Sequence, residues 1–187
     1  MKDISTKDMW NKAAGSALIL ALIPIAYSLA SMFIGKLTGG GVMASFLTTV
    51  IMGILWLAKF TGCILLMRFF LKDFAVSSKE ITRSDTYRYG LMISLMSAFI
   101  CAAYFLVDVL YIQPDTYKEA MDTMIQANGA MIDSNTRDAL EHFREDIPVI
   151  GFVCNLIYCF LFGMVLSSIL SGRVTPDDTF ESGADEQ

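Results

Sequence analysis

Residues 147–172 read IPVIGFVCNLIYCFLFGMVLSSILSG, a run of 26 residues without a charged side chain. A helix of about 20 apolar residues crosses the hydrocarbon core of a bilayer, which is about 30 Å thick. Three more charge-free runs, at 13–35, 37–58 and 89–107, are each long enough for one crossing. The four runs predict membrane-spanning helices at 13–35, 42–71, 90–112 and 148–171.

The composition indicates the same class of protein. Hydrophobic residues make up 55% of the 187 residues and charged residues only 18%, whereas a soluble domain is about one quarter charged. A soluble domain of this size cannot bury so much apolar side chain. The net charge of −5 and the lack of a basic run disfavour nucleic-acid binding. We therefore expect an all-α integral membrane protein, a four-helix bundle in the lipid bilayer.

The flanking charges predict an orientation. With four spans, both termini share a side with the middle loop, and eight Lys and Arg residues flank the spans on that side against four on the other. The positive-inside rule therefore predicts cytoplasmic termini in the cell inner membrane. A cleaved signal peptide is the alternative for the first run, but its 23 residues exceed the usual apolar core of about 7–15.

The expected domain organisation is one membrane domain over residues 1–173. Residues 174–187 carry five acidic side chains and no basic one, which is typical of a disordered tail. The outer loop, 113–147, holds eight acidic and three basic residues. A capping-box pattern at Thr116–Glu119 predicts a first short helix there, and a second one should start at Asp133 or Ser134 and run to about Glu145. Across the membrane, Ser84–Thr86 is expected to cap the third span.

Two ionisable residues are expected within the hydrocarbon part of the predicted spans, Lys59 and Asp108, whereas Arg68 would lie in the cytoplasmic interface. Such residues are costly in lipid and are candidates for function by default. Lys59 lies about one turn from the expected cytoplasmic boundary, so its side chain should snorkel to the interface. Asp108 shares one helix face with small residues, which favours contact with protein over lipid. Those residues are Ser94, Ser97, Ala98 and Cys101.

The fourth span carries six small or polar residues at four-residue spacing. Such a ridge lets two membrane helices approach closely. It predicts packing within the bundle, with a homodimer seam or a polar pathway as alternatives. Asn155 lies on this ridge at nearly the depth of Asp108, so we expect a hydrogen bond between them, with Tyr104 or Tyr158 nearby. The ridge residues are Gly151, Asn155, Cys159, Gly163, Ser167 and Ser171.

Known catalytic patterns are missing from the sequence. His142 is the only histidine, and its carboxylate neighbours form no zinc-protease motif. The four cysteines lie in the spans, where thiols behave as small hydrophobic groups. We therefore expect no catalytic residue, no cofactor and no metal site.

Three stretches carry a resemblance to a known family: AGSALIL at 14–20, the aromatic and basic segment 81–93, and YIQPD at 111–115. Over about residues 10–173 the chain resembles the domain-of-unknown-function family 4199, small four-span membrane proteins found mainly in Bacteroidota. The family has no established activity and offers no functional residues to transfer. The resemblance implies an accessory role in envelope lipid-linked glycan metabolism, with a family-two glycosyltransferase as a candidate partner.

Together these observations favour a non-enzymatic inner-membrane protein that binds another membrane protein or a second copy of itself. The acidic outer loop or the cytoplasmic loop would be the contact surface. The alternative is a small oligomeric transporter or channel with Lys59, Asp108 and Asn155 in its pathway. A membrane enzyme acting on lipid-linked substrates is the third hypothesis, and it lacks paired carboxylates or a metal cluster at an interface.

Overall fold

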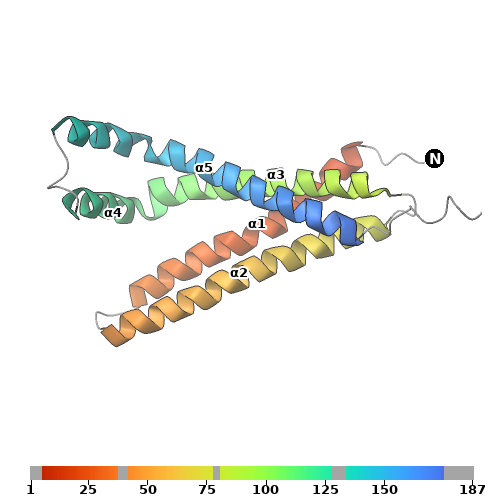
Figure 1. Ribbon diagram of the computed structural model, residues 1–187, viewed down its shortest axis with the longest axis horizontal. Coiled ribbons are helices and arrows are strands. Elements are labelled where there is room, and N and C mark those ends of the chain that lie inside the picture. Colours follow the sequence, from red (N-terminus) through yellow and green to blue (C-terminus); the bar gives the residue numbers. More distant parts are fainter. Residues whose placement is uncertain (1–5, 38–41, 78–80, 128–133, 175–187) are drawn as a thin grey trace, which may run out of the picture. The chain divides into compact units, whose positions relative to one another are not determined.

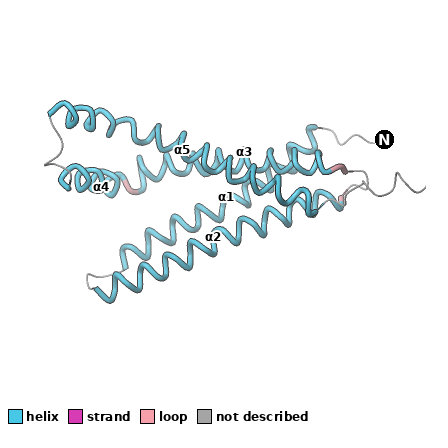
Figure 2. Tube along the Cα trace, in the orientation of Figure 1, coloured by secondary structure: helices cyan, strands magenta, loops and turns pink. Residues whose placement is uncertain are grey.

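The computed structural model describes residues 6–37, 42–77, 81–127 and 134–174. Nearly all of these residues are helical, and no strand occurs among them (Figures 1 and 2). The predicted all-α fold class is confirmed. The elements are α1 (Thr6–Leu37), α2 (Val42–Val76), α3 (Arg83–Val107), the π-helical turn η1 (Asp108–Ile112), α4 (Pro114–Ala127) and α5 (Ser134–Val174).

Four stretches are long and apolar enough to cross a membrane, as predicted. They are Lys7–Gly35, Met43–Val76, Arg83–Ile112 and Asp146–Val174. The chain is therefore a multi-pass membrane protein. The 35 residues of α2 extend about 52 Å at 1.5 Å per residue. Because this exceeds the hydrocarbon thickness of about 30 Å, α2 must tilt or project beyond the core.

The helices are longer than the charge-free runs. Helix α1 begins at Thr6, before the predicted start at 13, and α2 continues to Val76, beyond the predicted end at 71. Backbone hydrogen bonding does not stop where the apolar sequence stops. The loop helix predicted to end near Glu145 and the span predicted at 148–171 form one continuous helix, because α5 runs through Pro148 from Ser134 to Val174. A proline removes one helical hydrogen bond, which membrane helices tolerate.

Two predicted helix starts need correction. Helix α3 is capped by Thr82, which precedes the predicted cap at 84–86. The Thr82 N–H donates to Asp85 Oδ2 at 3.3 Å, and the Asp85 N–H donates to Thr82 Oγ1 at 3.3 Å. This reciprocal pair is a capping box. Helix α4 begins at Pro114, before the predicted box at 116–119, because proline suits the first helical position, where no N–H is needed.

The chain forms two compact units, residues 1–97 with 159–187, and residues 98–158. In the first unit, the start of α1, the end of α2, the start of α3 and the end of α5 share one hydrophobic core. Small alanines of α1 leave room for large side chains of α2 and α3. The core residues are Ala13, Ala17, Leu20, Met67, Phe70, Leu71, Phe74, Tyr89, Ile93 and Leu170.

Polar contacts join three helices at the edge of this core. The Tyr89 ring of α3 stacks on Phe74 of α2, with centroids 4.0 Å apart and planes at 11°. Its hydroxyl lies 3.0 Å from Ser16 Oγ of α1 in a buried hydrogen bond. Lys12 Nζ of α1 lies 2.8 Å from Asp73 Oδ2 of α2. Tyr89 therefore packs its ring against α2 and forms a hydrogen bond to α1 through its hydroxyl.

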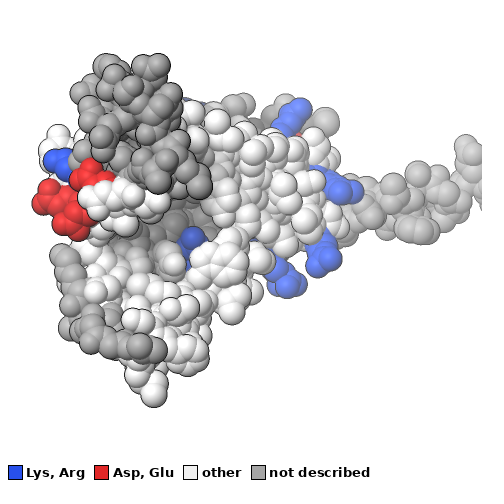
Figure 3. All heavy atoms as spheres, turned by 60° about the vertical axis from the view of Figure 1, so that its left-hand side comes forward, with Lys and Arg blue, Asp and Glu red and all other residues white. Residues whose placement is uncertain are grey.

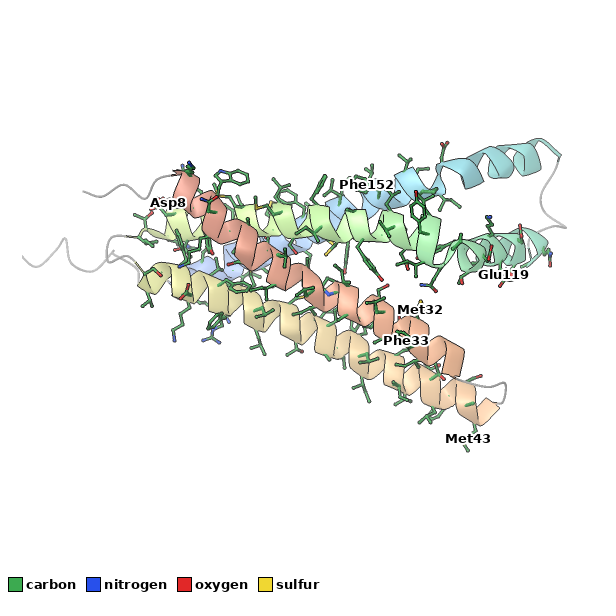
Figure 4. The ribbon with its side chains drawn as sticks, turned by 180° about the vertical axis from the view of Figure 1, so that it is seen from behind. Asp8, Met32, Phe33, Met43, Glu119 and Phe152 are labelled. Atoms are coloured by element: carbon green, nitrogen blue, oxygen red, sulfur yellow. The ribbon has the colours of Figure 1, made fainter. Side chains whose placement is uncertain are left out.

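Helices α1 and α2 run side by side to their connection (Figure 1). Apolar side chains near that connection are exposed, including Phe33 at 59% and Met43 at 81% (Figure 4). Such exposure suits a lipid environment, in which apolar side chains need not be hidden from water. The single domain predicted over 1–173 stays a prediction, and the predicted tail beyond residue 174 lies outside the described residues.

Candidate functional site

Helix α3 ends in a π-helical turn that begins at Asp108. The backbone N–H of Gln113 donates to the Asp108 carbonyl at 2.8 Å, a bond that spans five residues. Turns of this type are rare and often occur at functional sites. The Asp108 side chain is only 4% exposed. Its carboxylate accepts hydrogen bonds from Gln113 Nε2 at 3.2 Å and from Tyr117 Oη at 3.1 Å.

These contacts hold the direction in which α4 leaves α3. The Tyr117 ring also meets the Phe105 ring edge-on, with centroids 6.1 Å apart. We call Phe105, Asp108, Gln113 and Tyr117 the α3–α4 corner. Burial, together with the Asp108 charge, raises the pKa of Tyr117 to about 12. The Tyr117 hydroxyl therefore keeps its proton at neutral pH and remains a donor to the carboxylate.

A second phenol lies beside the corner. The Tyr104 hydroxyl oxygen is buried and has no hydrogen-bond partner within the described part of the chain. It is close enough to Tyr117 to contribute to the raised pKa of that phenol. Few buried polar groups in proteins lack a partner. The hydrogen-bonded carboxylate of Asp108 in the corner thus lies near a hydroxyl without a partner, that of Tyr104.

The predicted buried face of α3 and η1 is confirmed. Five residues on this face are all buried: Ser94, Ser97, Ala98, Cys101 and Asp108. The hydrogen bond between Asp108 and Asn155 stays a prediction. The sequence reasoning missed Gln113 and Tyr117 as partners of Asp108. Pro114 was the available signal, because it breaks α3 and lets the chain turn at this point.

Part of the α5 ridge packs against α3 in the first unit. A Cβ atom built on Gly90 would lie 2.6 Å from Ser167 Oγ, and one built on Gly163 would overlap the Ser94 side chain. Each glycine therefore faces a serine of the other helix. The serines are satisfied within their own helices, because Ser94 donates to the Gly90 carbonyl and Ser167 to the Gly163 carbonyl, each at 2.7 Å.

The other ridge positions have varied surroundings. Gly151 lies against the Phe105 ring in the second unit. Ser171 is buried, whereas Cys159 and Asn155 are half-buried. A single packing seam along all six ridge residues therefore stays a prediction. The α3 half of the contact could have been found in the sequence, because Gly90 and Ser94 have the same four-residue spacing.

Lys59 of α2 is held by aromatic rings of the first unit. Its Nζ lies 4.7 Å from the ring centroid of Tyr27 on α1 and 5.3 Å from that of Phe60. A cation over an aromatic face gains about 2 kcal/mol when desolvated. This contact gives the charge a partner inside the protein. Snorkelling of Lys59 to an interface stays a prediction.

The sequence of this chain matches a known protein family. Residues 16–172 match the family described as Protein of unknown function (DUF4199). The chain belongs to the DUF4199 family. This membership confirms the resemblance drawn from the sequence. The DUF4199 chain matches none of the curated proteins and none of the solved structures.

The chemistry open to this DUF4199 protein follows from its donors and acceptors. Asp108 offers a buried carboxylate and Tyr117 a protonated donor. Tyr104 offers a hydroxyl that can still form a hydrogen bond. Within the described residues, no three His, Cys, Asp or Glu side chains are grouped to hold a metal ion. His142 lies outside the described side chains. The arrangement suits hydrogen bonding and the positioning of α4.

Proposed function

We propose that this protein is a non-enzymatic inner-membrane protein, with both termini in the cytoplasm, that binds a protein partner through α4. One observation carries the proposal: the buried Asp108 carboxylate accepts hydrogen bonds from Gln113 and from Tyr117 of α4. A carboxylate inside a membrane helix is costly. Here it serves to hold a short helix in a defined direction.

Helix α4 needs such support. It has 14 residues, and isolated helices of fewer than about 12–15 residues are marginal in water. It also presents Asp115, Glu119 and Asp122 along one side, where i, i+4 and i+7 residues of a helix are neighbours. Like charges at this spacing destabilise a helix by a few tenths of a kcal/mol per pair. Lys118, three residues after Asp115 and four before Asp122, offsets part of this repulsion, so it is the short length of α4 that the corner compensates.

We call Asp115, Glu119 and Asp122 the acidic face of α4. All three side chains are exposed, and acidic groups gather in one patch in Figure 3. Figure 4 labels Glu119 on this helix. A partner with basic side chains would meet complementary charge along this face, so binding would be favourable at this surface. The acidic face is thus the proposed contact surface.

The partner class is a membrane protein of the cell envelope. The resemblance drawn from the sequence implies an enzyme of lipid-linked glycan metabolism, such as a glycosyltransferase, and we propose it as one candidate. A second copy of the chain is the other candidate. The predicted orientation would place α4 outside the cytoplasm, where such a partner would have to present its basic surface.

The test is co-purification in mild detergent after cross-linking in membranes. The double substitution Asp115→Lys/Glu119→Lys is expected to reduce recovery of the partner at least tenfold, because it reverses the charge of the face. Asp8→Lys, which changes an exposed acid of α1, is the matched control and should leave recovery unchanged. Salt should weaken the wild-type complex.

A second pair of variants tests the corner. Tyr117→Phe removes the hydrogen bond to Asp108 and should reduce partner recovery without unfolding the spans. Tyr111→Phe changes an exposed phenol of η1 and serves as the control. Recovery of a lone protein under several gentle conditions would contradict partner binding. Loss of solute flux in vesicles on Asp108→Asn and Lys59→Gln would instead support the transporter alternative.

A further inference from the structure

A pocket of about 220 Å³ lies beside the α3–α4 corner in the second unit. Three elements contribute its walls: η1, the first turn of α4, and the part of α5 around its internal proline. The lining residues are Val109, Leu110, Pro114, Tyr117, Lys118, Ile147 and Pro148. Most of this wall is aliphatic or proline, and Lys118 is its only charged member.

The pocket lies near the ends of two of the apolar stretches. The third apolar stretch ends at Ile112 and the fourth begins at Asp146, so the lining residues fall within a few positions of both ends. An apolar pocket with few polar partners holds water poorly. A molecule with an apolar chain, drawn from the adjacent leaflet, would gain by covering these walls.

Lys118 supplies a charge at the rim. Its side chain is exposed, and it makes no ion pair within the described residues. At 3.6 residues per turn, Lys118 lies on α4 between the pocket wall, which includes Tyr117, and the acidic face, which includes Asp115 and Asp122. A headgroup bound at Lys118 would therefore meet an ammonium on one side and carboxylates on the other.

We propose that this pocket binds one zwitterionic phospholipid of the phosphatidylethanolamine class from the adjacent leaflet, the outer one in the proposed orientation. Its acyl chain covers the wall formed by Leu110 and Ile147. Its phosphate pairs with the Lys118 ammonium, and its own ammonium group faces the carboxylates of α4. A purely anionic lipid would keep the first contact but be repelled by the carboxylates. Lipid binding at this site requires no protein partner.

Native mass spectrometry of the detergent-purified protein tests this site. Phosphatidylethanolamine and phosphatidylglycerol with identical acyl chains are added in equal amounts. The wild type is expected to retain one phosphatidylethanolamine in preference to phosphatidylglycerol. Lys118→Gln should weaken this binding about tenfold, because a charge-assisted hydrogen bond is lost. Lys7→Gln, an exposed lysine of α1, should bind as the wild type does.

A second substitution tests the apolar wall. Leu110→Trp should fill the pocket and also weaken binding about tenfold, whereas Ile112→Trp changes a residue of the same turn that does not line the pocket. Both positions are partly exposed, and far-UV circular dichroism checks that each variant folds. If Leu110→Trp fails to fold, the comparison of Lys118→Gln with Lys7→Gln still tests the proposal. Equal retention of both lipids, or equal binding by Lys118→Gln and Lys7→Gln, would overturn the proposal.

Discussion

Replacing Gly163 by alanine tests how closely α5 approaches α3. The added methyl group would overlap the Ser94 side chain and lie 3.3 Å from the Ser94 Cα atom. Carbon atoms pack best at about 3.5–4.0 Å. Rotation of the Ser94 hydroxyl cannot relieve the overlap with its Cβ and Cα atoms, so the helices must move apart. Overpacking of this kind costs about 1–3 kcal/mol.

Gly53→Ala provides the matched control. A Cβ atom built on Gly53 meets nothing within 4 Å. Both substitutions gain helix propensity, which favours alanine over glycine by about 1 kcal/mol. The difference between the two variants therefore isolates the steric effect. We expect Gly163→Ala to be about 1–3 kcal/mol less stable than Gly53→Ala.

The assay is unfolding by sodium dodecyl sulfate in mixed micelles, followed by circular dichroism. A double-mutant cycle adds Ser94→Gly, which removes the opposing side chain. In that background, most of the extra cost of Gly163→Ala should disappear, because only the 3.3 Å contact with the Cα atom of residue 94 remains. Equal stability of the two alanine variants, or no rescue by Ser94→Gly, would refute the close approach of α3 and α5 at this position.

Three further predictions concern hydrogen bonds and charges. A tyrosinate titration, with the Tyr117→Phe curve subtracted, should place the pKa of Tyr117 at about 12, and Asp108→Asn should lower it because a negative charge is removed. Since an unfolded tyrosine has a pKa of about 10, the stability of the wild type relative to Tyr117→Phe should be complete below pH 10 and fall as the pH rises through about 12; a fall starting near pH 8 would contradict this. Tyr89→Phe should cost about 1 kcal/mol in the same unfolding assay, because a buried hydrogen bond to α1 is lost, and an unchanged midpoint would show that the bond contributes nothing. Lys12→Met should cost less than about 1 kcal/mol, because the ion pair with Asp73 is exposed, and high salt should reduce the difference.

The fold class follows from local properties of the chain. Each charge-free run is long enough for one crossing, and lipid offers no hydrogen-bond partner to an unfolded backbone. A helix satisfies its backbone hydrogen bonds within itself, so the four helices could be predicted without knowing which elements pack against them. Helix ends were harder to predict, because Thr82 and Ser84 both have side chains that can cap a helix. The observed cap depended on where the chain begins to turn.

The candidate site, too, could be predicted from the sequence only in part. Helical periodicity alone placed Asp108 on the buried face of α3 and η1, and its burial agrees. Periodicity says nothing about residues beyond the end of the helix. Tyr117 reaches Asp108 because the chain turns at Pro114 and α4 starts there. A hydrogen bond across such a turn depends on the turn geometry, which a pattern of residue types does not specify.

By itself, the sequence determined that this DUF4199 protein crosses the membrane as helices and which side of α3 is buried, because hydrophobicity and helical repeat are properties of one segment at a time. Only the tertiary structure decided which groups meet. It placed Gly163 against Ser94, Lys59 over the Tyr27 ring, and Asp108 within reach of Tyr117. These contacts join residues on different helices, so they depend on rotation and spacing that each helix acquires only by packing against another.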